Sequence, residues 1–190
     1  MRVSRPWEAQ VEHLVRERYG RLVGYAMLLT GSRPDAQDLV QDALISTFGG
    51  RARFSTIGEA EQYVRRAIAS RSVDEARRRA RERAATGRFA SWAVPAVVVE
   101  VGGLSADLQR ALVALSPRER ACVVLRQLED LSVRETAAAL GLSEGAVKRY
   151  TSDGLGRLDA ALGTSSDPGH ETVPVRSVHT ATSTKERRDA

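Results

Sequence analysis

The chain has 190 residues, a length that accommodates one or two small domains. Hydrophobic residues make up 42% of it but aromatic residues only 5%, which favours helices packed through Leu, Val and Ala over a β-sandwich. The net charge of +5 is carried mostly by Arg. This is compatible with a nucleic acid partner, although GC-rich codon usage explains the Arg excess equally well.

The single cysteine and the lack of long apolar segments indicate the cellular compartment of the protein. Cys122 is the only cysteine, which excludes an internal disulfide and is typical of a reducing environment. No segment approaches the ~20 apolar residues of a membrane span. The N-terminus also lacks the apolar core of a signal peptide. We therefore expect a cytoplasmic protein with no membrane partner.

The first half of the chain shows three helical segments. Apolar residues at helical spacing predict a first helix over about residues 7–29. Ser32 then caps a second helix, which the glycines at 49 and 50 end. Thr56 and Glu59 form a capping box that opens a third, longer helix.

The later turns of this third helix are strongly basic. Between Arg65 and Arg88 nine arginines stand against three acidic residues, a local net charge of +6. Like charges along one helix repel each other, and a polyanion would relieve that repulsion. DNA contact is therefore favoured over the plainer alternative of a solvated face.

The second half begins with a change of composition. Residues 87–103 are punctuated by Gly and Pro and show no helical period, so we interpret them as a flexible linker. Helical spacing returns over residues 104–162. Residues 163–190 are rich in Ser, Thr and Pro without periodicity, which predicts a disordered tail. The expected fold is all-α, with two small helical domains, 6–86 and 104–162, joined by a flexible linker.

The segment 132–158 has the spacing of a helix-turn-helix. Ala137 is small enough to let two helices approach, Gly141 supplies the positive φ of the turn, and Val147 buries the second helix against the first. The second helix of such a unit is built to lie in the major groove of DNA. An αα-hairpin without a nucleic acid role is the plainer alternative.

Three motifs occur in a characteristic order: DAQDLVQDAL (Asp35–Leu44), SRSVDEARRR (Ser70–Arg79) and the run Leu115–Ser152 that contains the helix-turn-helix. With them the chain resembles the bacterial sigma-70 family of RNA polymerase sigma factors. Within that family it resembles the extracytoplasmic-function (ECF) group, of the actinobacterial type, which has only sigma regions 2 and 4. The resemblance implies region 2 at 6–86, for core polymerase and the −10 element, and region 4 at 104–162, for the −35 element.

The resemblance also implies the partners: core RNA polymerase through its β′ and β subunits, promoter DNA, and an anti-sigma factor as an optional third. The helix with the first motif would bind core polymerase, and its acidic residues fall on one stripe at i, i+3 and i+7. A solvated acidic face is the alternative. The expected polymerase-binding residues are Asp35, Asp38, Leu39, Gln41 and Asp42.

Two further groups of residues would contact DNA. In the first, Phe54 would stack on a base flipped from the opened strand. The expected −10 residues are Arg53, Phe54, Ser70, Arg71, Asp74, Arg77, Arg78 and Arg79. The expected −35 residues are Ser143, Glu144, Ala146, Lys148, Arg149, Tyr150 and Asp153.

Some positions depart from the family pattern. Ser70 stands where the family commonly has Asn, and Asp153, where a basic residue is usual, would repel phosphate. Arg149 could read a guanine edge in compensation. Gly154 and Gly156 weaken the recognition helix by up to about 1 kcal/mol each relative to Ala. Two rival interpretations stay open: a stand-alone helix-turn-helix regulator that acts without polymerase, and a degenerate sigma-like interaction protein, which Asp153 and the two glycines would favour.

Nothing in the sequence indicates catalysis. No His, Cys and carboxylate cluster has metal-ligand spacing, and the glycines do not form a nucleotide-binding loop. We expect no enzymatic activity, no cofactor and no metal.

Overall fold

The computed structural model describes residues 6–49, 54–86 and 105–163. Within these residues it contains helices and no strand, as the all-α prediction requires. The helices are α1 (Pro6–Thr30), α2 (Arg33–Gly49), α3 (Ile57–Thr86), α4 (Ala106–Ala114), α5 (Pro117–Gln127), α6 (Val133–Leu140) and α7 (Glu144–Leu162). The predicted linker 87–103 lies outside the described residues, as does the tail from 164 onward.

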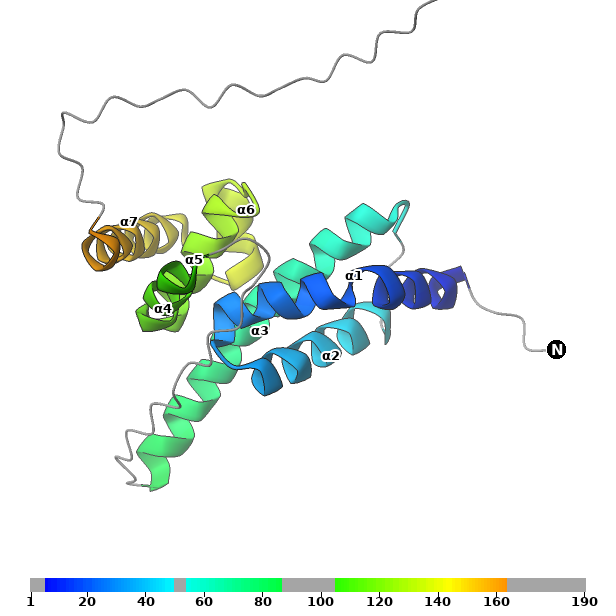
Figure 1. Cartoon of the computed structure of the whole chain (residues 1–190), viewed down its shortest axis with the longest axis horizontal. Helices are drawn as coiled ribbons and strands as arrows, with labels where there is room; N and C mark the ends of the chain where they lie inside the picture. Colours follow the sequence, from blue (N-terminus) through cyan, green and yellow to red (C-terminus); the bar gives the residue numbers. More distant parts are fainter. Residues whose placement is uncertain (1–5, 50–53, 87–104, 164–190) are drawn as a thin grey trace, which may run out of the picture.

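The first three helices pack on one another through a shared apolar core. Their innermost side chains are completely buried: Leu14, Leu22, Val40, Val64 and Ile68. The apolar stripes of α1, α2 and α3 face each other, which is how amphipathic helices satisfy burial. The last turns of α3 extend beyond the other helices (Figure 1). The basic end of this helix is therefore presented away from the core.

The last four helices form the helix-turn-helix unit and its support. Ser116 and Ser132 each begin a helix with a complete capping box, in which a Glu three residues later closes the reciprocal bond. Gly141 ends α6 with φ 60°, and Val147 is completely buried. These features confirm the predicted turn. Gly163 ends α7 with φ 66°, so this residue belongs to the helix end and not to the tail.

The two groups of helices contact each other directly. α3 packs against α5 and α6, and α1 packs against α4 and α5. Figure 1 shows α4–α7 gathered on one side of the α1–α3 layer. The buried apolar side chains of both halves belong to one continuous cluster. The sequence predicted two domains but gave no sign of this contact between them.

Candidate nucleic-acid and protein interfaces

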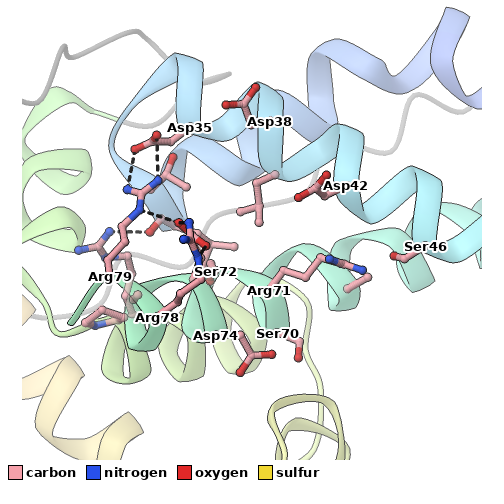
Figure 2. A pocket seen from close by; sticks show the side chains of 18 of the residues that line it. Asp35, Asp38, Asp42, Ser46, Ser70, Arg71, Ser72, Asp74, Arg78 and Arg79 are labelled. Atoms are coloured by element: carbon pink, nitrogen blue, oxygen red, sulfur yellow. Dashed lines mark hydrogen bonds and ion pairs between the residues drawn. The ribbon is translucent and has the colours of Figure 1, made fainter. Parts of the chain in front are cut away.

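A groove of mixed charge runs between α2 and the second half of α3, and α5 closes one end of it. One wall carries Asp38 and Asp42 from α2, and the opposite wall carries Arg71 from α3 (Figure 2). Pro117 and Arg120 line the end at α5. The fold thus places the acidic motif and the basic motif, which are separate in the sequence, face to face.

The acidic stripe is divided by its surroundings. Asp38, Gln41 and Asp42 are exposed on α2. Asp35 is half-buried and accepts two bonds from the Arg79 guanidinium, each 3.1 Å long (Figure 2). Leu39 is only 8% exposed and belongs to the core, because it lies on the α2 face that packs inward. The sequence analysis expected Leu39 to contact the polymerase. The buried side chain offers little accessible surface for such a contact.

Sequence reasoning missed an apolar residue beside this stripe. Ile45 is 62% exposed and follows Asp42 by three residues, so both lie on the same face of α2. The signal was available, since Ile45 falls outside the apolar stripe formed by its neighbours. Exposed acidic residues next to an exposed apolar side chain form a surface suited to a protein partner with basic and apolar groups.

Several arginines of α3 are held by acidic neighbours. Arg78 donates to Glu75 at 2.7 and 2.8 Å and to Glu82 at 2.6 Å, and Arg79 donates to Glu75 at 2.8 Å. The bonds from Arg78, and then those from Arg79, lower the pKa of Glu75 to about 2. Nη1 of Arg77 lies 3.6 Å from Oδ1 of Asp74. The acidic residues of the motif thus orient the arginines and offset part of their charge.

An aromatic cluster lies where α3 begins. The Phe54 ring packs edge-on against Phe48, with centroids 5.7 Å apart, and lies 5.3 Å from the Tyr63 ring. Phe54 is half-buried, whereas Tyr63 is 48% exposed and lines the groove. Tyr63 is thus the more accessible ring for stacking, which helical spacing alone did not reveal. Arg53 lies outside the described residues, and Ser70, Arg71 and Asp74 line the groove.

The predicted −35 residues lie along the first half of α7. Ser143 caps the helix by accepting a bond from the Ala146 amide at 3.2 Å. Glu144, Lys148, Arg149 and Asp153 are exposed, and Ala146 is half-buried. Four charged side chains of the predicted set therefore reach solvent on the recognition helix.

Tyr150 differs from these neighbours because it is held between two arginines. Its hydroxyl accepts a bond of 3.0 Å from Arg118 at the start of α5, and the Arg149 guanidinium lies 5.0 Å from its ring centroid. The bond from Arg118, followed by that from Arg149, lowers the pKa of Tyr150. The sequence analysis did not single out Arg118, whose contact with Tyr150 joins residues 32 positions apart.

The structure gives one recognition-helix glycine a packing role. A Cβ at Gly154 would lie 2.7 Å from Cγ2 of Val123 and 3.4 Å from Cβ of Glu119. Gly154 therefore lets α7 approach α5 closely, and its cost in helix propensity is offset by contact. A Cβ built at Gly156 has no described atom within 4 Å. No packing contact therefore offsets the loss of helix propensity at this position.

Neither metal ligation nor membrane insertion is visible in the part of the chain that the structure describes. It holds no group of three or more His, Cys, Asp or Glu residues placed for a metal ion. Its helices are also too polar or too short to cross a bilayer.

Comparison with known proteins bears on both groups of helices. Residues 14–82, which span most of α1–α3, match the sigma-70 region 2 family, and residues 105–158, which span α4 to most of α7, match sigma-70 region 4. The RNA polymerase sigma-E factor of Streptomyces avermitilis is 36% identical over 80% of this chain and 85% of its own length. The chain belongs to the sigma-70 family.

Further relatives define the group within this family. The ECF RNA polymerase sigma factor SigE of Mycolicibacterium smegmatis is 34% identical over 72% of this sigma factor and 55% of its own length. The sigma factor RpoE of Bartonella quintana, solved in complex with the anti-sigma factor NepR, shares the fold at TM-score 0.60 and 23% identity. That similarity covers 82% of this chain and 97% of that one. The protein is thus an actinobacterial-type ECF sigma factor, which acts with core RNA polymerase in promoter-specific initiation. The region 2 match accounts for α1–α3, which a stand-alone regulator leaves unexplained.

Proposed function

We propose that this sigma factor divides its work between three surfaces and acts as an initiation factor in the cytoplasm, without enzymatic activity of its own. Under this proposal the polymerase forms every phosphodiester bond. The observation that carries the proposal is the groove between α2 and α3, where the acidic and basic motifs lie on opposite walls. The third surface is the exposed face of α7.

The exposed face of α2 is the proposed polymerase-binding surface. Asp38, Gln41 and Asp42 offer charge and hydrogen-bond acceptors, and Ile45 adds an apolar contact at the same face. Acidic residues at such a rim pair with basic residues of a partner and set its orientation. Asp35 acts indirectly in this proposal, since it already holds Arg79.

The groove side of α3 is the proposed −10 surface. Arg71 lines the groove next to Ser70 and Asp74, and Tyr63 presents a half-exposed ring at the same groove. Bases of an opened strand stack on such rings, while arginines hold the backbone. Tyr63 therefore takes the stacking role that the sequence analysis gave to Phe54, whose ring is packed against Phe48.

The exposed face of α7 is the proposed −35 surface. Arg149 can read a guanine edge in the major groove, and Lys148 can hold a phosphate. Arg118 restrains Tyr150 beside them. An anti-sigma factor is a further proposed partner, supported by the RpoE–NepR complex of Bartonella quintana, whose fold this chain shares.

A run-off transcription assay with core polymerase on fragmented genomic DNA tests the proposal. Asp38→Arg combined with Asp42→Arg should abolish co-purification with core polymerase and promoter-specific transcripts while far-UV circular dichroism is unchanged. Glu12→Arg is the matched control, since Glu12 is an exposed acid on α1 away from the groove. Unchanged polymerase binding by the double variant would show that the acidic residues of α2 form an ordinary solvated face.

The same assay addresses the remaining rival. A degenerate sigma-like interaction protein would bind core polymerase without directing any specific start site. A holoenzyme that forms but yields no discrete transcript would favour that rival over the proposed function.

A further inference from the structure

The start of α5 lies along one side of the recognition helix α7. A Cβ at Gly154 would lie 3.4 Å from the Cβ of Glu119, and Nη1 of Arg157 donates to Oε2 of Glu119 at 3.0 Å. Tyr150 precedes Gly154 by four residues, so it lies on the same side of α7, one turn closer to the start of the helix. This register places Tyr150 opposite Arg118, which precedes Glu119 in α5.

The Tyr150 hydroxyl has one hydrogen-bonding capacity left. It accepts a bond of 3.0 Å from Nη1 of Arg118, and a tyrosine hydroxyl can also donate its own proton. No residue that the structure describes accepts this proton. The bond from Arg118, and then that from Arg149, lowers the pKa of Tyr150, and a hydroxyl polarised in this way is a stronger donor. The proton is therefore available to an acceptor on a ligand.

Two positive charges without acidic partners lie beside this hydroxyl. Cζ of Arg118 lies 5.9 Å and Cζ of Arg149 lies 5.0 Å from the centroid of the Tyr150 ring. Within the described residues neither arginine forms an ion pair, not even Arg149 with Asp153, one turn further along α7. This differs from α3, where carboxylates hold several arginines. The described residues therefore leave the positive charge of this cluster available to a ligand.

The chemistry of the cluster selects an anion with several acceptor oxygens. A guanidinium can only donate, and the Tyr150 hydroxyl, which already accepts from Arg118, has only its proton to offer. Each base pair presents a donor as well as acceptors in the major groove and is uncharged. A phosphate presents acceptors alone and carries a full negative charge, which strengthens its hydrogen bonds. The ligand that fits is therefore a phosphate of the DNA backbone.

We propose that Arg118 is a positioning residue for the −35 contact, because it holds the Tyr150 hydroxyl as a donor to one phosphate of the −35 element. The inference rests on the proposed −35 role of α7 and extends it to a side chain of α5, which lies outside the helix-turn-helix. Phosphate contacts fix the register of a protein on the duplex. The Tyr150 ring also holds the Arg149 guanidinium. The Arg118–Tyr150 pair therefore determines where along the duplex Arg149 reaches a base edge.

Neutralising single phosphates of the −35 element tests the contact. Duplexes of a promoter that the run-off assay identifies each carry one uncharged methylphosphonate in this element, and the affinity of the holoenzyme is measured for each duplex. At one phosphate this change should weaken binding by the wild type about tenfold, because a hydrogen bond to a charged group is lost. Holoenzyme with Tyr150→Phe, which lacks the donor, should bind that duplex and the unmodified one equally to within about twofold.

A double-mutant cycle tests whether Arg118 acts through Tyr150. Arg118→Ala should weaken promoter binding as Tyr150→Phe does and should abolish the sensitivity to the same phosphate. Arg118→Gln, which keeps an N–H group for the hydroxyl, should restore part of that sensitivity. In combination with Tyr150→Phe, Arg118→Ala should add little, because the effects of coupled residues are not additive. Arg110→Ala is the matched control and should keep the wild-type profile, since Arg110 is an exposed arginine of region 4 that is paired with Asp107.

The outcomes separate this inference from the proposed function. Wild-type holoenzyme that binds no promoter specifically would overturn the −35 role of α7, and the inference with it. Specific binding by the wild type, with a phosphate profile that Tyr150→Phe leaves unchanged, would overturn the Arg118–Tyr150 contact alone. Additive effects of Arg118→Ala and Tyr150→Phe would also overturn it. Far-UV circular dichroism checks that each variant is folded, and Tyr150→Phe, which keeps the ring, decides the question should Arg118→Ala not fold.

Discussion

The two glycines of the recognition helix should respond in opposite directions to the same substitution. Replacing Gly by Ala inside a helix stabilises it by about 0.5–1 kcal/mol. At Gly156 a Cβ meets no described atom within 4 Å, so the gain should be complete. For a cooperative unit of this size, Gly156→Ala should raise Tm by about 1–4 °C.

At Gly154 the same Cβ would lie 2.7 Å from Cγ2 of Val123, a stiff β-branched side chain in the core. It would also lie 3.5 Å from the Glu119 carbonyl oxygen, which cannot move without shifting α5. Overpacking of a core costs about 1–3 kcal/mol, which exceeds the gain in helix propensity. Gly154→Ala should therefore lower the free energy of unfolding by about 1–2 kcal/mol.

Thermal denaturation followed by far-UV circular dichroism, at equal protein concentration, measures both variants. Val123→Ala provides a double-mutant cycle: it leaves a cavity that the new Cβ at position 154 partly fills. The pair should thus be less destabilised than the sum of its singles by about 0.5 kcal/mol or more. An increase in Tm for Gly154→Ala equal to that of Gly156→Ala would refute the close approach of α7 to α5.

Three further predictions concern single side chains. Arg149→Ala should cost about 1–3 kcal/mol of promoter affinity and relax preference at one base pair, whereas Lys148→Ala should weaken all sequences alike, as measured by competition binding with the holoenzyme. Tyr150 should ionise at lower pH than an ordinary tyrosine because Arg118 stabilises its phenolate. In an ultraviolet titration the wild type should show one tyrosine that ionises at lower pH than the others, and Tyr150→Phe should lack that transition. The lowered pKa of Glu75 means that its contribution to stability is present above about pH 4.5 and lost toward about pH 2. Glu75→Gln should therefore be less stable than wild type at neutral pH in urea denaturation, and the gap should close on acidification.

Local features were predictable from sequence, and distant contacts were not. The cap at Ser32 and the turn at Gly141 depend on residues a few positions apart, and both were confirmed. The Arg79–Asp35 pair spans 44 residues and the Arg120–Leu29 bond spans 91, so helical spacing carries no information on them. For the same reason Gly154 was interpreted only as a weak helix former, because its value depends on a different helix.

The carboxylates interleaved with the arginines of α3 have a consequence for where the sigma factor is found in a cell. A helix whose full basic charge faced solvent would adhere to any stretch of chromosome, since non-specific binding is almost entirely electrostatic. Glu75, Glu82 and Asp35 hold Arg78 and Arg79 and so reduce this attraction. Because a genome offers about 10⁶–10⁹ competing sites, even a modest reduction at each site leaves a larger free pool of the protein. The acidic partners therefore act against loss of the factor to random DNA and keep it available for polymerase.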